Sequence, residues 1–302
     1  METMRFSYRL LVLLAICFNL QFEQCVEIYI TPSSYYSPCP VKKCFSLSQV
    51  SNKSVLDSLT DSQNTTLIFL SGDYKLESNI LMMNASNITV ISRTSNVSIF
   101  CHQNAGLKFE GIKWLVVKGL KFFSCGNNKV KLVKNILMEK VSFVGENKSE
   151  TALEIDRVVA YIIDTSFMYN TVGSLRGPIR ILQGHKRQHA YVGGAIIANH
   201  SNITIIRSEF LGNRAEIGGA IFATQVSKIV INNSSFIGNS AMNYSVGFCF
   251  GGVLYTDSGV NGADNPIAKT LVVLSKSKFS SNSAKKGAVL ATINSTVDVY
   301  SS

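Results

Sequence analysis

Cysteine and asparagine are the residues of this 302-residue chain whose spacing most clearly implies chemistry. Six of the seven cysteines follow an apolar N-terminal segment, and an even number of cysteines suits disulfide formation in an oxidising compartment. Cys39 and Cys44 are close enough to close a small loop, and Cys101 and Cys125 lie 24 residues apart. Cys25 and Cys249 have no obvious partners.

Asparagine supplies candidate sites for a second covalent modification, N-glycosylation. The sequence holds twelve Asn-x-Ser/Thr sequons, whereas about four are expected from its composition. This excess predicts a glycosylated, extracellular surface. The candidate acceptors are Asn52, Asn64, Asn84, Asn87, Asn96, Asn147, Asn199, Asn202, Asn232, Asn243 and Asn294; the twelfth, Asn233, adjoins Asn232, and we do not expect both to be modified.

The N-terminus supports the same compartment. Two arginines, Arg5 and Arg9, precede an apolar run from Leu10 to Phe18, which is the pattern of a secretory signal peptide and is too short to span a bilayer. We assign residues 1–24 to the signal and expect secretion. Cleavage after Cys17 and cleavage near Gln24 both remain open.

Catalytic patterns are weak by comparison. Hydrolysis of polysaccharides needs paired carboxylates, and elimination needs acidic calcium ligands with a base. The sequence has no Asp-Asp pair and no Gly-His-Gly triplet. His185 and His189 could bind one metal ion but have no third ligand nearby. We therefore expect no catalytic residues, no metal and no cofactor.

Positive charge is concentrated in two segments. The net charge of +10 equals the surplus of residues 108–140 (+6) and of residues 173–192 (+4). One interpretation is a patch that docks an anionic glycan or an acidic protein; the other, which we favour, is lysine protecting sheet edges. Nucleic acid is not expected as a partner of a secreted chain. The patch candidates are Lys113, Lys118, Lys121, Lys129, Lys131, Lys134, Arg176, Arg180, Lys186 and Arg187.

Two interleaved motifs reveal the elements that must position these residues. Gly-Gly-Ala-Ile begins at Gly193 and Gly218, and related copies occur as Gly251-Gly-Val-Leu254 and Lys286-Gly-Ala-Val289. Phe-x-x-Asn begins at Phe167, Phe210, Phe236 and Phe279, with weaker copies at Phe122 and Phe143. Short β-branched runs separate the motifs, and such strands gain stability only by stacking as a solenoid. The two spacings of 43 residues fit either two coils or one coil with an insertion.

The alternation of strand residues predicts which columns face inward. We expect the phenylalanines to stack inside and the asparagines three residues later to pair along the turns. The small residues two before each phenylalanine should also point inward, and the polar residues three before it outward. The outward column is Lys140, Asp164, Arg207, Asn233 and Lys276.

Stacking also gives the cysteines a geometry. Neighbouring coils lie about 4.8 Å apart, which suits the Cα separation of a disulfide. We expect Cys101 and Cys125, one coil apart, to be bonded. A helix over 46–59 should cap the first coil, and residues 173–192 and 260–269 should be inserted loops.

The paired motifs resemble the polymorphic outer-membrane-protein repeat of right-handed parallel β-helices, most closely over 193–241. Ser71-Gly-Asp-Tyr74 followed by Asn87-Ile-Thr-Val-Ile91 is similar to the start of a pectin-lyase-like helix. The resemblance implies a fold and a surface location, and it does not imply catalysis. Because the last repeat stops at Ser302, we expect a C-terminal portion to be missing, through which any membrane association would arise.

The expected fold is an all-β, right-handed parallel β-helix with a short N-terminal capping helix. Residues 25–63 form the cap and residues 64–302 the helix. The expected function is a secreted, glycosylated, non-catalytic binding or adhesion scaffold for an extracellular glycan or protein. The alternative is a polysaccharide-active lyase or hydrolase.

Overall fold

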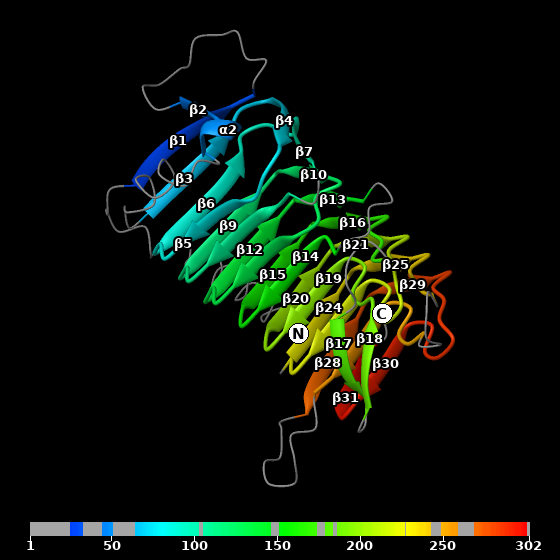
Figure 1. Cartoon of the computed structure of the whole chain (residues 1–302). Coiled ribbons are helices and arrows are strands. Elements are labelled where there is room, and N and C mark those ends of the chain that lie inside the picture. The colour runs from blue at the N-terminus through cyan, green and yellow to red at the C-terminus, as the bar shows by residue number, and fades with distance from the viewer. Residues whose placement is uncertain are drawn as a thin grey trace.

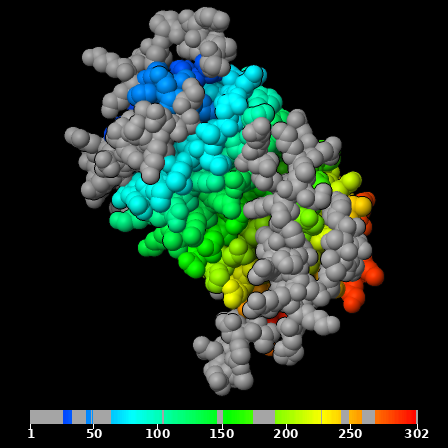
Figure 2. Space-filling model, in the orientation of Figure 1, coloured from blue at the N-terminus to red at the C-terminus, as the bar shows by residue number. Residues whose placement is uncertain are grey.

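The computed structural model describes residues 25–32, 44–50, 64–102, 105–145, 151–173, 179–183, 186–226, 228–242, 249–258 and 269–300. Their strands stack into an elongated parallel β-helix whose first strands lie at one end and last strands at the other (Figure 1). In the space-filling view the colours follow one another along the long axis (Figure 2). The all-β fold class is confirmed, and the long parallel sheets are compatible with the right-handed solenoid that we expected.

Three parallel sheets, which we name A, B and C, form the sides of the solenoid. Sheet A has eleven strands in the order β2 (Cys44–Ser46), β1 (Cys25–Thr31), β3 (Asn64–Phe69), β6 (Asn87–Ser92), β9 (Trp114–Lys118), β12 (Asn135–Glu139), β15 (Val159–Ile163), β20 (Asn202–Ile206), β24 (Lys228–Asn232), β28 (Thr270–Ser275) and β31 (Ser295–Tyr300). Sheet B has eight, from β4 (Gly72–Leu76) through β7 (Val97–Cys101), β10 (Lys121–Phe123), β13 (Ser142–Val144), β16 (Ser166–Met168), β21 (Glu209–Leu211) and β25 (Ser235–Ile237) to β29 (Lys278–Ser280). Sheet C has eight, from β5 (Ile80–Met83) through β8 (Leu107–Glu110), β11 (Asn128–Lys131), β14 (Leu153–Asp156), β19 (Ile196–Asn199), β23 (Ile221–Thr224) and β27 (Leu254–Asp257) to β30 (Leu290–Ile293).

Each coil passes from sheet A to B to C, and alternate side chains fill one continuous apolar core. The phenylalanine column is confirmed as part of it. Phe122, Phe143, Phe167, Phe210, Phe236 and Phe279 stack in sequence with ring centroids 4.5–5.2 Å apart. Because Phe167 stacks directly on Phe210, and Phe236 on Phe279, each spacing of 43 residues is one coil with an insertion.

The column two residues before each phenylalanine also faces inward, as we expected. Its hydroxyl groups accept hydrogen bonds from the backbone of the preceding coil: the N–H of Thr165 donates to Ser208 Oγ (3.2 Å), that of Ser208 to Ser234 Oγ (3.1 Å), and that of Ser234 to Ser277 Oγ (3.2 Å). These bonds satisfy backbone donors at the corner between sheets A and B, where no strand partner is available.

The polar column three residues before each phenylalanine faces outward, and its backbone explains its position. All five members have φ between 47° and 55°, in the left-handed region. Asparagine and aspartate tolerate this conformation better than other non-glycine residues, but lysine and arginine hold three of the five positions. The repeated corner, supported on both sides by strands, holds them there.

The glycine pairs serve two different purposes, as Gly218 and Gly219 illustrate. Gly218 has φ +63, whereas a Cβ on Gly219 would lie 2.3 Å from the carbonyl oxygen of Gly252 in the next coil.

The fourth copy of the motif requires a correction. Gly251 stands opposite Gly287, so the last repeat reads Gly287-Ala-Val-Leu290, one residue later than the sequence alignment placed it.

At the N-terminal end, two strands of the segment predicted as a cap extend sheet A. β1 pairs with β3 in sheet A, so the sheet begins before residue 64. Within the described residues, one helical turn, α2 (Leu47–Val50), lies inside the helix predicted over 46–59; the remainder of that prediction, over 51–59, lies outside the described part. Ser46 and Gln49 form a capping box, and Leu47 is buried in the core.

The insertion over 173–192 also requires a correction. The sequence predicted a loop, but β17 (Ile179–Gln183) and β18 (Lys186–Ala190) form an antiparallel hairpin. β22 (Arg214–Ala215) and β26 (Ser240–Ala241) make a further short parallel pair. Most of the loop predicted over 260–269 lies outside the described residues.

None of the helical structure in the described ranges is long and apolar enough to cross a membrane.

Candidate binding surface

The disulfide expected between neighbouring coils is present. Cys101 and Cys125 are bonded, with Cα atoms 4.9 Å apart. Cys44 is also disulfide-bonded, but its predicted partner Cys39 lies outside the described residues. Cys249 is a buried free thiol.

The glycan acceptors in the described residues lie mainly around sheet A. Asn64, Asn87, Asn202 and Asn232 belong to strands of sheet A, Asn84 and Asn294 to the turns from sheet C to sheet A, Asn199 to the end of β19, and Asn96 to the turn before β7. Four of these side chains are exposed: Asn84, Asn96, Asn202 and Asn294. Asn87 donates a hydrogen bond to Asn64, and Asn199 Oδ1 accepts one from Thr224 (2.7 Å). Asn52, Asn147 and Asn243 lie outside the described residues.

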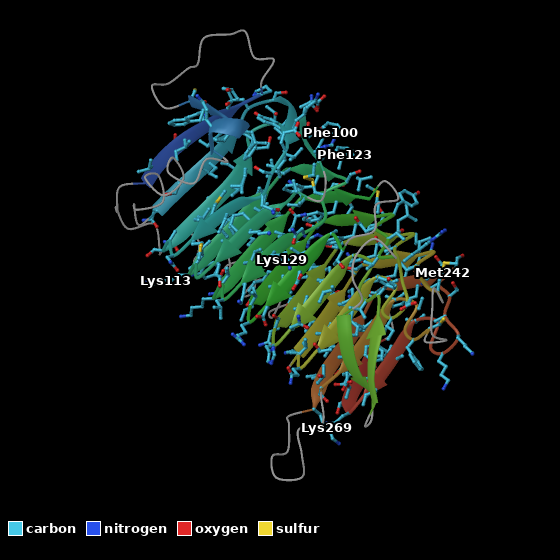
Figure 3. All side chains as sticks on the ribbon, viewed as in Figure 1. Phe100, Lys113, Phe123, Lys129, Met242 and Lys269 are labelled. Atoms are coloured by element: carbon cyan, nitrogen blue, oxygen red, sulfur yellow. A yellow bond between two sulfur atoms is a disulfide. The ribbon has the colours of Figure 1, made fainter. Side chains whose placement is uncertain are left out.

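The six lysines of the predicted patch are distributed over the three sheets. Lys118 belongs to sheet A, Lys121 to sheet B, and Lys129 and Lys131 to sheet C. Lys113 and Lys134 lie in the turns from sheet C to sheet A (Figure 3 labels Lys113 and Lys129). The solenoid therefore does not gather them into one stripe.

Ion pairs between coils neutralise half of these lysines. Lys118 Nζ lies 2.8 Å from Glu139 Oε2, Lys129 Nζ 2.9 Å from Glu154 Oε2, and Lys131 Nζ 3.6 Å from Glu110 Oε1. On the outer face of sheet C, Lys108, Lys129 and Lys131 are thus balanced by the three carboxylates of Glu110, Glu154 and Asp156.

Lys113 and Lys134 are the pair that the fold does bring together. The backbone N–H of Asn135 donates to Lys113 O (3.1 Å), which places the two lysines in register on neighbouring coils. Both side chains are exposed, and neither forms an ion pair within the described part of the chain. The other basic candidates cannot be placed on a surface: Arg176 lies outside the described residues, as do the side chains of Arg180, Lys186 and Arg187.

Carboxylates that could act on a polysaccharide are engaged by basic side chains. Glu154 and Asp156 project from β14, and Asp156 Oδ1 lies 3.5 Å from His200 Nδ1. Asp164 accepts two hydrogen bonds from Arg207, at 2.7 and 2.8 Å, and this contact raises the pKa of the Arg207 guanidinium. Within the described ranges, no three His, Cys, Asp or Glu residues form a cluster able to hold a metal ion. His185 and the side chain of His189 lie outside those ranges.

A second apolar cluster covers part of the outer face of sheet C. Ile197, Phe222 and Tyr255 belong to successive strands and are buried with Val192 and Ile217 from the preceding turns. Burial raises the pKa of the Tyr255 phenol, and the nearby carboxylate of Asp257 raises it further. This part of sheet C is thus covered by the chain itself.

Sequence reasoning missed the outer face of sheet B. The residue after each ladder phenylalanine points outward, yet in five successive coils it is apolar: Phe123, Val144, Met168, Leu211 and Ile237. Phe100 extends this column and stacks on Phe123, with ring centroids 4.8 Å apart (Figure 3). The alternation rule used for the inward columns would have identified it.

Comparison with known proteins does not assign the chain to a family. No protein family model matches the chain, and no curated protein shows significant similarity to it.

Proposed function

We propose that this protein is a secreted, glycosylated β-helix that acts as a binding scaffold. The observation that carries the proposal is the placement of acceptor asparagines: Asn84, Asn202 and Asn294 have exposed side chains on sheet A or the adjoining turns. The Cys101–Cys125 disulfide supports an oxidising compartment.

The internal ladders support a scaffold role. Stacked phenylalanines and hydrogen-bonded asparagines hold neighbouring coils in one register over most of the solenoid. A rod held in this way keeps surface residues of different coils at fixed separations. Fixed separations favour a partner that spans several coils, since little ordering entropy is lost on binding.

An anionic glycan is the partner that the exposed Lys113 and Lys134 favour. Both are free of the ion pairs that engage Lys118, Lys129 and Lys131. Their backbones lie on neighbouring coils, about 4.8 Å apart, so both ammonium groups are available to one anionic chain. Salt would weaken such a contact because both groups are exposed.

The alternative, a polysaccharide-active enzyme, would draw on Glu154 and Asp156. Their Cα atoms, two residues apart on one strand, are about 6.6 Å apart, and both side chains lie on the same face, as a carboxylate pair of a glycosidase requires. The ion pair of Glu154 with Lys129 and the contact of Asp156 with His200 engage both carboxylates, which favours the scaffold over this alternative.

Expression of the full chain in eukaryotic secretory cells tests the proposal. We expect the protein in the medium and a gain in gel mobility after enzymatic deglycosylation. Asn202→Gln should remove one glycan, whereas Asn135→Gln, outside any sequon, should remove none. Retention inside the cell, or mobility that deglycosylation leaves unchanged, would contradict the proposal.

Chromatography on immobilised heparin tests the partner. We expect retention at low salt and elution at modest salt, with earlier elution of K113Q/K134Q. The matched control, K118Q/K129Q, removes the same charge from ion-paired lysines and should elute close to the unmodified protein. Release of shortened or unsaturated oligosaccharides from polyanionic glycans, lost in E154Q, would instead establish the enzyme.

A further inference from the structure

The outer face of sheet B carries two parallel columns of side chains that run along the solenoid. The apolar column contains Phe100, Phe123, Val144, Met168, Leu211 and Ile237. The column beside it, counted from β4 to β29, contains Asp73, Ser98, Lys121, Ser142, Ser166, Glu209, Ser235 and Lys278. Four serines and four charges therefore flank an apolar stripe.

Charges at equal distances from the centre of the column have opposite signs. Asp73 is first and Lys278 eighth, while Lys121 is third and Glu209 sixth. Counting inward from the two ends, each acidic position meets a basic one, and each serine meets a serine. The centre lies between β13 and β16.

These four charged side chains form no ion pairs with the described residues of their own chain. Asp73, Lys121, Glu209 and Lys278 are exposed, and none makes an ion pair with any residue that the structure describes. On sheets A and C, by contrast, lysines pair with carboxylates of nearby coils. In the apolar column, Phe100 is 40% exposed, and the other five side chains are partly buried.

We propose that sheet B is the interface of a homodimer, in which a second copy of this chain lies face to face and antiparallel. The two-fold axis runs parallel to the strands, between β13 and β16. It places Lys121 opposite Glu209 of the second copy, and Asp73 opposite Lys278 of the second copy. Every charge in the column thereby gains an opposite partner, as a closed two-fold interface requires.

The same operation matches the apolar column to itself. Phe100 meets Ile237 of the second copy, Phe123 meets Leu211 of the second copy, and Val144 meets Met168 of the second copy. Each pair joins a residue from one half of the sheet to one from the other half, and both aromatic rings face aliphatic side chains. A two-fold axis along the solenoid, centred on the two columns, would instead set the charged column of each copy against the apolar column of the other and leave the charges unpaired, which costs free energy.

The face is open but modest in size. None of the acceptor asparagines in the described ranges lies on the strands of sheet B, and Asn96 lies in the turn between sheets A and B that precedes β7. Eight strands span about 34 Å, and three-residue strands are about 10 Å wide. Two such faces bury less than the ~1,600 Å² of a standard interface. We therefore expect a reversible dimer with a dissociation constant in the micromolar range.

Charge reversal combined with sedimentation tests the pairing. The unmodified protein should change from monomer to dimer between about 1 and 100 µM. K121E and E209K should each weaken dimerisation at least tenfold, and K121E/E209K should restore it because the swapped charges again face each other. K228E, an exposed lysine of sheet A, is the matched control and should leave it unchanged. Far-UV circular dichroism checks that each variant is folded.

Crosslinking tests the register. Ser98→Cys and Ser235→Cys proteins, mixed and treated with a short bis-maleimide, should give a covalent dimer. Each alone should not, because the axis separates its two copies by about 24 Å. The unmodified protein controls for the buried Cys249. A monomer at 100 µM, a double variant that fails to restore dimerisation, or crosslinking of either variant alone would overturn the proposal.

Discussion

Asn213 Oδ1 accepts two hydrogen bonds from Asn170, one from its backbone N–H (3.1 Å) and one from its Nδ2 (2.9 Å), although 43 residues separate them. Asn239 binds Asn213 in the same way, and Asn282 binds Asn239. Each Nδ2 also donates to the carbonyl oxygen of a ladder phenylalanine. The amides thus form hydrogen bonds with the buried backbone N–H and C=O groups at the corner between sheets B and C, where the hydrogen bonds between strands end.

Removal of one ladder amide should destabilise the solenoid far more than removal of a surface amide. Asn213→Ala deprives Asn170 of an acceptor for two donors, in a position where Asn213 is fully buried. We expect a loss of about 3 kcal/mol in the free energy of unfolding, measured by denaturant titration. Asn135→Ala on the outer face of sheet A should change it by less than about 0.5 kcal/mol. Equal losses in the two variants would contradict the ladder's role.

Alanine at two glycines separates close packing from backbone conformation. Gly219→Ala would place Cβ 2.3 Å from a carbonyl oxygen of the next coil, and we expect a loss of more than about 3 kcal/mol or failure to fold. At Gly238 the φ is +63 but a Cβ would meet no described atom within 4 Å, so Gly238→Ala should cost only about 1 kcal/mol. Thermal unfolding of both variants measures the difference, and the reverse ranking would show that the contact between coils is not the constraint.

Much of the repeat architecture was predictable because stacking turns sequence periodicity directly into columns. The phenylalanine ladder, the inward serines and the Cys101–Cys125 bond all follow from one coil length near 24 residues. The hairpin over 179–190 did not follow, because an insertion need not share the repeat. The shift of the last glycine motif to Gly287 escaped for a related reason: alanine at 288 made the alignment ambiguous by one residue.

The surface was harder to predict than the core. The sequence identified a basic segment, but three sheets divide its lysines among three faces, and Glu110, Glu139 and Glu154 neutralise three of them. Composition counts charges and cannot show which coil supplies the counter-ion. Only the register of neighbouring strands reveals that Lys113 and Lys134 lie together while Lys121 lies apart.

The Cys101–Cys125 bond should stabilise the protein mainly by restricting the unfolded chain. A closed loop of this length contributes about 3 kcal/mol. C101A and C125A should each lose about this much in denaturant titrations, and C101A/C125A should lose little more, because either change alone removes the cross-link. Full additivity of the single losses would show that side-chain packing, and not the bond, is responsible.

The Cys249 thiol should be protected from alkylation while the protein is folded. Burial raises the pKa of Cys249 above its usual value near 9, the carboxylate of Glu216 raises it further, and Lys285 opposes them. We therefore expect negligible reaction with iodoacetamide at pH 8 in the native state and rapid reaction in denaturant. Because the unfolded thiol loses its proton first as pH rises, Cys249 should lower the free energy of unfolding above pH 9. The difference between the unmodified protein and C249A isolates this effect, and a difference that stays constant from pH 7 to 10 would refute it.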